Sequence, residues 1–174
     1  MDQSKLHLLL SQQEITEGVR KLGDQIRSDY DGLSPLLVGV LNGCFIFLAD
    51  LVRVVNIQVT LDFIQAQSYQ YTTSTGSVKV STMPQTPVGG RHVLLVEDIV
   101  DTGITIGHIM GQLQEEEPAS LKLCTLLDKP SRRVVSVTAD YVGFTVPDKF
   151  IVGYGLDLDQ QYRYLPDIYV LEEE

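Results

Sequence analysis

Three carboxylates lie close together near the middle of the 174-residue chain. Glu97 and Asp98 directly follow an apolar run at residues 93–96, and Asp101 comes three residues later. A turn with the pattern Thr-Gly-x-Thr then opens a helical pattern. In open α/β sheets, ligands bind beyond the carboxyl ends of the strands. If residues 93–96 form a strand that ends at the carboxylates, all three lie at the mouth of a binding site.

The turn that follows Asp101 has the composition of a phosphate-binding loop. It leads into a helix predicted at residues 103–116, where free backbone N–H groups and the helix dipole favour an anion. The hydroxyls of Thr102 and Thr105 add donors, and Gly103 lets the backbone approach a ligand closely. Two adjacent carboxylates suit the two hydroxyls of a ribose, directly or through a metal ion. Together these features predict a sugar-phosphate site.

Each of these features has a simpler interpretation when it is taken alone. Asp101 could be a helix N-cap, and Glu97 with Asp98 could be a solvated strand end. Their combination after a fully apolar strand favours the ligand site. Neither the Gly-x-Gly-x-x-Gly pattern of dinucleotide sites nor the Gly-x-x-x-x-Gly-Lys-Ser/Thr pattern of P-loops occurs in the sequence.

Composition argues against several other classes of protein. The net charge of −10 and the pI near 4.6 repel nucleic-acid backbones, so we expect no nucleic-acid partner. Cys44 and Cys124 each lie in an apolar run, which predicts two buried thiols rather than a metal or redox site. The leucine cluster at residues 8–10 is too short to span a bilayer. We therefore expect no membrane partner and a cytoplasmic location.

The elements that position this site follow an α/β pattern. Ser11 begins a capping box, and the helix after it carries an apolar face formed by Ile15, Val19, Leu22 and Ile26. Strands are predicted at residues 35–41, 59–66, 93–96, 121–127 and 141–146, and further helices at 45–54 and 103–116. This order predicts one domain with a mainly parallel central sheet flanked by helices. Residues 67–81 are predicted to form a long functional loop.

The same stretches resemble a known family. Residues 93–105 are similar to the motif that binds 5-phosphoribosyl diphosphate (PRPP) in type I phosphoribosyltransferases. Residues 41–53, 68–69, 126–129 and 142–163 resemble the hypoxanthine-guanine branch of that family. The resemblance implies a core at about residues 12–146 under a small C-terminal hood at about 147–174. It also implies purine salvage with PRPP and a purine base as substrates, Mg²⁺ as cofactor, and a homodimer or homotetramer.

The resemblance also implies roles for individual residues. On the ribose side, Glu97 and Asp98 hold the ribose hydroxyls, and Asp101 moves the proton on the purine's imidazole nitrogen. The 5′-phosphate is wrapped by Thr102, Gly103 and Thr105. Asp157 binds the Mg²⁺ ion beside the purine site, where Glu97 and Asp98 are the further candidate metal ligands.

On the purine side, Lys129 hydrogen-bonds the six-position carbonyl, Phe150 stacks on the ring, and the backbone of Ile151 reads the edge of the base. Pyrophosphate is held by the turn at Asn42 and Gly43 and by Arg163. Ser68 and Tyr69 belong to a flexible loop that closes over the site.

Physical chemistry supports these roles unequally. Lys129 is a donor only, so it fits a carbonyl and disfavours the amino group of adenine. Without the resemblance, Lys129 would be interpreted as a surface lysine, Phe150 as a core residue and Arg163 as an exposed charge. The family often carries Lys where this chain has Asn42. That change weakens pyrophosphate binding if the side chain matters, and matters little if the position acts through its backbone.

Three alternatives stay open at this point. A xanthine-preferring transferase would use the same carbonyl contact. A PRPP-sensing regulator that binds nucleic acid would need a basic face. The excess of 23 Asp and Glu over 13 Lys and Arg argues against such a face. A sugar-phosphate-binding module without catalysis would not need the combination of Asp101, Lys129 and Asp157.

Overall fold

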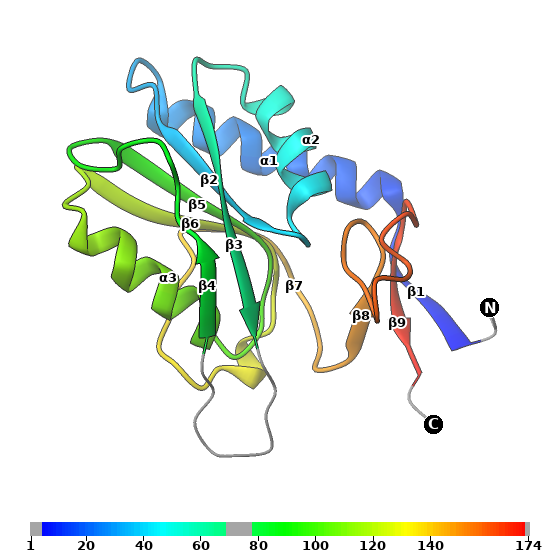
Figure 1. Ribbon diagram of the computed structural model, residues 1–174. Helices are drawn as coiled ribbons and strands as arrows, with labels where there is room; N and C mark the ends of the chain where they lie inside the picture. The colour runs from blue at the N-terminus through cyan, green and yellow to red at the C-terminus, as the bar shows by residue number, and fades with distance from the viewer. Residues whose placement is uncertain (1–4, 69–77, 173–174) are drawn as a thin grey trace.

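The computed structural model describes residues 5–68 and 78–172, which form two sheets and the helices around them (Figure 1). The larger sheet has the strand order β4-β3-β2-β5-β6-β7, and the small sheet has the order β1-β9-β8. The strands are β1 (Leu6–Leu10), β2 (Leu36–Leu41), β3 (Thr60–Ser68), β4 (Val78–Thr82), β5 (His92–Val100), β6 (Ser120–Asp128), β7 (Tyr141–Thr145), β8 (Phe150–Val152) and β9 (Ile168–Leu171). All neighbours in the larger sheet are parallel except β3 and β4, which confirms the predicted mainly parallel sheet.

Helices cover both faces of the larger sheet. Helices α1 (Gln12–Tyr30) and α2 (Phe45–Val55) pack on one face, and α3 (Ile104–Glu115) packs on the other (Figure 1). The predicted capping box is present at the start of α1, where Ser11 Oγ accepts from the Glu14 N–H at 3.3 Å and Glu14 Oε2 accepts from the Ser11 N–H at 2.8 Å. The predicted apolar face of α1 is buried. A short 3₁₀ turn, η2 (Pro130–Arg132), follows β6.

Strand β5 continues further than the apolar run predicted. It was expected to end at Val96, but it extends to Val100 and contains both Glu97 and Asp98. The strand is extended because β6 pairs with it up to Val100, although its pairing with β2 stops at Val96. The backbone ladder with β6 does not depend on apolar side chains. The two carboxylates therefore lie within β5, in the part beyond its pairing with β2.

The predicted loop at residues 67–81 is shorter than expected. Its first two residues belong to β3, which ends at Ser68, and residues 78–81 belong to β4, which pairs antiparallel with β3. The alternation Val-Lys-Val-Ser-Thr in β4 is a strand signal that the polar composition of the surrounding segment obscured. Tyr69 and the rest of the segment up to residue 77 lie outside the described residues.

The small sheet combines both ends of the chain. Strands β8 and β9 come from the predicted C-terminal cap, and β1, which was not predicted as a strand, pairs antiparallel with β9 (Figure 1). Cys44 and Cys124 are buried free thiols, as predicted. Within residues 5–68 and 78–172, no helix has the length and apolarity needed to cross a membrane.

Candidate active site

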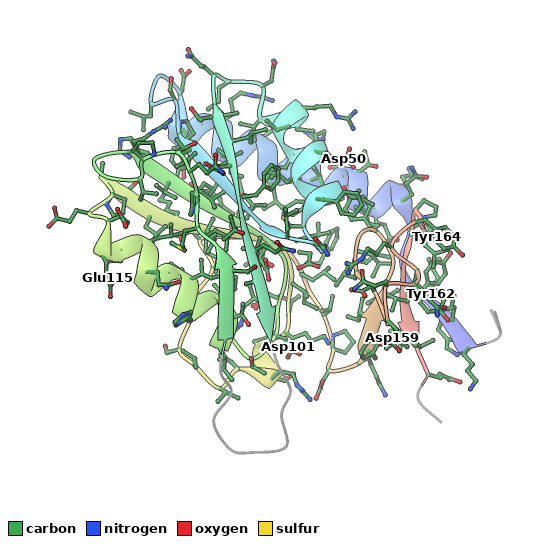
Figure 2. All side chains as sticks on the ribbon, in the orientation of Figure 1. Asp50, Asp101, Glu115, Asp159, Tyr162 and Tyr164 are labelled. Atoms are coloured by element: carbon green, nitrogen blue, oxygen red, sulfur yellow. The ribbon has the colours of Figure 1, made fainter. Side chains whose placement is uncertain are left out.

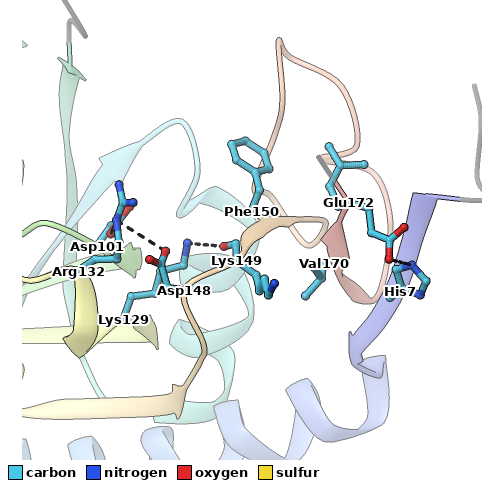
Figure 3. A pocket seen from close by; sticks show the side chains of 10 residues that line it. His7, Asp101, Lys129, Arg132, Asp148, Lys149, Phe150, Val170 and Glu172 are labelled. Atoms are coloured by element: carbon cyan, nitrogen blue, oxygen red, sulfur yellow. Dashed lines mark hydrogen bonds and ion pairs between the residues drawn. The ribbon is translucent and has the colours of Figure 1, made fainter. Parts of the chain in front are cut away.

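A cleft of about 960 Å³ separates the carboxyl ends of β5 and β6 from the small sheet (Figure 3). It brings together three residues that the sequence singled out, Asp101, Lys129 and Phe150, and seven that it did not, among them Arg132, Asp148 and Lys149. Figure 2 shows Asp101 at this edge of the larger sheet, and Asp159 in the loop that joins β8 to β9. Residues that are far apart in the sequence therefore surround one open space.

Asp101, Thr102 and Gly103 form the turn between β5 and α3, and Thr105 lies in the first turn of α3. The backbone between β5 and α3 is held in place, because the Thr102 carbonyl accepts from the N–H groups of Val134 at 2.9 Å and Val135 at 3.1 Å. Gly103 is the N-cap of α3, with φ at +81°, and a Cβ atom there would lie 2.8 Å from the Val135 carbonyl oxygen. The simpler interpretation of Asp101 as the N-cap is therefore wrong. Its carboxylate is directed to other partners.

Glu97 and Asp98 are largely withdrawn from solvent, since Asp98 is 9% exposed and Glu97 is half-buried. Burial and the nearby charge of Asp98 raise the pKa of Glu97 well above its usual range. Oε2 of Glu97 is buried and has no hydrogen-bond partner among the described residues. Burial also raises the pKa of Asp98 to about 6, although the Ile99 N–H bond and the charge of Arg163 oppose this shift. The interpretation of these two residues as a solvated strand end is therefore wrong.

The turn after β2 packs at Gly43 against the loop between β8 and β9. A Cβ atom on Gly43 would lie 1.8 Å from Oδ2 of Asp98, and one on Gly155 would lie 2.4 Å from the Gly43 carbonyl oxygen. Arg163 stabilises the facing loop by donating from Nη1 to the Gly155 carbonyl at 2.6 Å and by pairing through Nη2 with Asp157 at 2.6 Å. The predicted pyrophosphate residues Gly43 and Arg163 thus lie near Asp98 and Asp157.

Asn42 occupies the first position of this turn. Its side chain is exposed, and its carbonyl accepts from the Phe45 N–H at 3.3 Å. The peptide bond between Leu41 and Asn42 is cis. Within the described part of the chain, the Asn42 side chain makes no hydrogen bond, and the position is open toward solvent.

The purine-side residues have environments that their sequence context does not predict. Lys129 is buried, with 7% of its surface exposed, and its Nζ donates to the Lys149 carbonyl at 2.6 Å. Phe150, by contrast, is 38% exposed and lines the cleft. The simpler interpretations of Lys129 as a surface lysine and of Phe150 as a core residue are both wrong. Ile151 is buried in β8, which is an edge strand of the small sheet.

Two arginines that follow β6, Arg132 and Arg133, contact Asp101. Arg132 Nε donates to Oδ1 of Asp101 at 3.2 Å and lies 3.7 Å from Oδ1 of Asp148. Arg133 donates from Nη1 to the Asp101 carbonyl at 3.0 Å and pairs with Asp128. The sequence carries only a weak signal for them, which is a pair of adjacent arginines soon after a strand end. Spacing alone does not reveal which of the two faces the cleft.

The carboxylates suit a hard cation that takes part of its shell from a ligand. Within the described residues, no group of three or more His, Cys, Asp or Glu side chains is arranged to hold a metal ion. Mg²⁺ is usually bound by one or two protein carboxylates together with water and substrate phosphates. The unpartnered Oε2 of Glu97 fits such a partial site. So does the nearby Asp157, whose negative charge contributes to the raised pKa of Asp98.

The chain is similar over nearly its whole length to characterised proteins. Residues 8–159 match the family model described as the phosphoribosyl transferase domain. The hypoxanthine-guanine phosphoribosyltransferase of Streptococcus pneumoniae is 47% identical over 168 residues, which cover 96% of this chain and 93% of that protein.

Two solved structures show the same relationship. A hypoxanthine-guanine phosphoribosyltransferase of Bacillus anthracis, with HEPES in its active site, has a TM-score of 0.91 and 44% identity over 95% of this chain and 98% of its own. The hypoxanthine phosphoribosyltransferase of Trypanosoma cruzi, in complex with the product IMP, has a TM-score of 0.88 and 40% identity over 95% and 93%. With its fold and cleft as described, the chain belongs to the phosphoribosyltransferase family, in the hypoxanthine-guanine branch.

Proposed function

We propose that this protein transfers the 5-phosphoribosyl group of PRPP to hypoxanthine and guanine, giving IMP or GMP and pyrophosphate. The observation that carries the proposal is the convergence of Asp101, Lys129 and Phe150 on one cleft beside the phosphate-type turn. These residues supply a proton acceptor, a donor for a carbonyl and a stacking surface. The relatives described above are named for hypoxanthine or for hypoxanthine and guanine, so the xanthine-preferring alternative has no support from them.

Asp101 acts as the general base in this reaction. The bond from the anomeric carbon to pyrophosphate breaks while a bond to the purine nitrogen forms. The N–H proton of that nitrogen passes to the Asp101 carboxylate. A base must lie within hydrogen-bond reach of the proton it takes, and the half-exposed position of Asp101 in the cleft allows this approach.

The ribose phosphate binds along the end of β5. Thr102, Gly103 and Thr105 wrap the 5′-phosphate at the start of α3, where the helix dipole favours an anion. Glu97 and Asp98 accept hydrogen bonds from the ribose hydroxyls. The burial of Asp98 and the unpartnered Oε2 of Glu97 support this role, because a buried acceptor gains from a donor that replaces its lost water.

The leaving pyrophosphate lies at the turn after β2. The backbone at Asn42 and Gly43 donates to it, and Arg163 contributes a positive charge beside that turn. Asp157, with Glu97 and Asp98 as further candidate ligands, would hold Mg²⁺, and the ion would supply positive charge to the departing oxygens. The predicted closure by Ser68 and Tyr69 stays a prediction.

The purine lies between the phosphoribosyl group and the small sheet. Phe150 presents an exposed aromatic face for stacking. The ammonium of Lys129 has three donors, so it can keep its bond to the Lys149 carbonyl while it donates to the six-position carbonyl of the base. The backbone of Ile151 reads the edge of the base, since β8 is an edge strand whose other side pairs with no strand among residues 5–68 and 78–172.

The test is turnover by the purified protein with PRPP, Mg²⁺ and separate additions of hypoxanthine, guanine, xanthine and adenine. We expect turnover with the first two, and absence of turnover with all four bases would contradict the proposal. Asp101→Asn should lower kcat by about 100-fold or more, as expected for loss of a general base, while PRPP binding is retained. Near-normal turnover in that variant would remove the general-base role.

A cytoplasmic location belongs to the same proposal. It is supported by the two free buried thiols, Cys44 and Cys124, which accord with a reducing compartment. Assembly as a homodimer or homotetramer stays a prediction, which sedimentation of the purified protein tests.

A further inference from the structure

Arg132 connects the proposed general base to the segment that carries the stacking ring. Its Nε atom lies 3.2 Å from Oδ1 of Asp101 and 3.7 Å from Oδ1 of Asp148 (Figure 3). Asp101 follows β5, whereas Asp148 lies two residues before Phe150, the first residue of β8. One guanidinium therefore joins the two sides of the cleft at the point where the purine is expected to bind.

This contact fixes a carboxylate that would otherwise rotate. The terminal torsion of an aspartate side chain has broad minima, so its rotamer preference does not set the direction of its oxygens. Within the described residues, the hydrogen bond and ion pair of the Asp101 carboxylate reach Oδ1 and come from Arg132 alone. Oδ2 is left for another donor. A directional donor at one oxygen thus determines where the other oxygen points.

The neighbouring arginine has a different task. The Arg133 side chain is 16% exposed, and it bonds the Asp101 carbonyl and the Asp128 carboxylate, so it holds the backbone of the turn. The Arg132 side chain is 46% exposed, and its hydrogen bond and ion pairs within the described residues go to carboxylates alone. An ion pair this exposed adds little to folding stability. Its position beside Asp101 is therefore better explained by the reaction than by the fold.

We propose that Arg132 is a positioning residue for the transferase reaction. It holds Oδ1 of Asp101 and anchors on Asp148, so that Oδ2 of Asp101 faces the N–H of a purine stacked on Phe150. The inference rests on the proposed function, since it requires Asp101 to receive a proton. Within the described residues, the Arg132 side chain contacts the carboxylates of Asp101 and Asp148 and neither Thr102–Thr105 nor the turn after β2, so its removal should leave the proposed phosphate and pyrophosphate groups in place.

The experiment is a double-mutant cycle on kcat with wild type, Arg132→Met, Asp101→Asn and the double variant, at saturating PRPP and hypoxanthine. Arg132→Met should lower kcat about tenfold, a loss typical of a misoriented catalytic group, with little change in the KM for PRPP. In the Asp101→Asn background, the same substitution should have no further effect, because a residue that acts through Asp101 loses its role when that carboxylate is gone.

The matched control is Arg20→Met, which removes a similarly exposed arginine that pairs with two carboxylates on α1, far from the cleft. It should leave kcat unchanged, and thermal unfolding of all variants should remain close to that of wild type. Equal losses of kcat from Arg132→Met in both backgrounds, or no loss in the wild-type background, would overturn the positioning role while leaving the proposed function in place. An inactive wild-type protein would overturn both.

Discussion

Gly43 lies directly against the carboxylate of Asp98, so closely that a Cβ atom on residue 43 would be 1.8 Å from Oδ2. The two residues come from the turn after β2 and from β5, which are parallel neighbours in the larger sheet. In the facing loop, the charge of Arg163 lowers the pKa of Asp98 and the charge of Asp157 raises it. The absence of a side chain at residue 43 therefore brings the proposed pyrophosphate turn and the proposed ribose carboxylate together.

Gly43→Ala should displace either the turn or the carboxylate. Overpacking of this kind typically costs about 1–3 kcal/mol, and both groups belong to the proposed PRPP site. We expect a lower free energy of unfolding and a raised KM for PRPP, measured by urea unfolding and by steady-state kinetics. Gly111→Ala is the control, because a Cβ atom there meets nothing within 4 Å and alanine favours the helix. An unchanged KM for PRPP in Gly43→Ala would contradict the assignment of this turn.

A partly buried hydrogen bond connects α2 with the loop between β8 and β9. The hydroxyl of Tyr154 donates to Oδ2 of Asp50 at 2.6 Å, and Tyr154 precedes Gly155, which packs on the Gly43 carbonyl. Tyr154→Phe removes this bond, at a cost of about 1–2 kcal/mol. Because the loop that carries Asp157 and Arg163 depends on it, we expect weaker inhibition by pyrophosphate and a raised KM for PRPP.

The chain offers a closely matched control for this substitution. Tyr141 is similarly buried, and its hydroxyl donates to Oδ2 of Asp29 at the same distance of 2.6 Å, but it lies at the amino end of β7. Tyr141→Phe should therefore lose similar stability and leave the PRPP kinetics unchanged. If both variants alter the KM for PRPP equally, the effect of Tyr154→Phe is one of general stability, and the connection to the site is refuted.

Lys129 should determine the preference for a carbonyl at position six of the base. Lys129→Gln replaces a charged donor with a neutral group, and a hydrogen bond to a charged group is worth about 1.5–3 kcal/mol. The KM for hypoxanthine and guanine should rise roughly 10–100-fold, while the KM for PRPP changes little. Lys149→Gln tests the effect of local charge, since only the backbone carbonyl of Lys149 contacts Lys129. A similar rise in both variants would point to charge rather than to direct contact.

The linear motif predicted the local structure of the candidate site well where neighbouring residues in the chain are also neighbours in space. Asp101, Thr102 and Gly103 occupy the turn between β5 and α3 as expected, because a strand, a short turn and a helix follow one another locally. The end of β5 was misplaced, since its length depends on pairing with β6 rather than on its own apolar residues. Local sequence carries no information about where a partner strand stops.

Contacts between distant segments could not be predicted in this way. Gly43 and Asp98 are 55 residues apart, and nothing in either segment specifies their contact. The pairing of β1 with β9 and the contact of Arg132 with Asp101 likewise arise from tertiary packing. The environments of Lys129 and Phe150 are opposite to those expected from their residue types, because a ligand cleft exposes an aromatic ring and buries a charge.

The buried carboxylate of Asp98 should make the stability of the metal-free protein depend on pH. Its pKa is raised to about 6 in the folded state, against about 3.9 in an unfolded chain. The folded state therefore binds this proton more tightly, and the resulting stabilisation is complete below about pH 4 and is lost as the pH rises through about 6. A shift of about two units corresponds to roughly 3 kcal/mol.

Asp98→Asn removes this titration and keeps the shape of the side chain. The difference in free energy of unfolding between the variant and wild type should grow in favour of the variant between about pH 4 and pH 7, by up to about 3 kcal/mol, and then stay level. Urea unfolding at a series of pH values in the presence of EDTA measures it. Taking the difference cancels the contributions of the other carboxylates, apart from that of Glu97, whose pKa Asp98 itself helps to raise. If the free energy of unfolding depended on pH in the same way in the two proteins, Asp98 would be hydrated in solution. The burial of its carboxylate near the end of β5 would then not hold there.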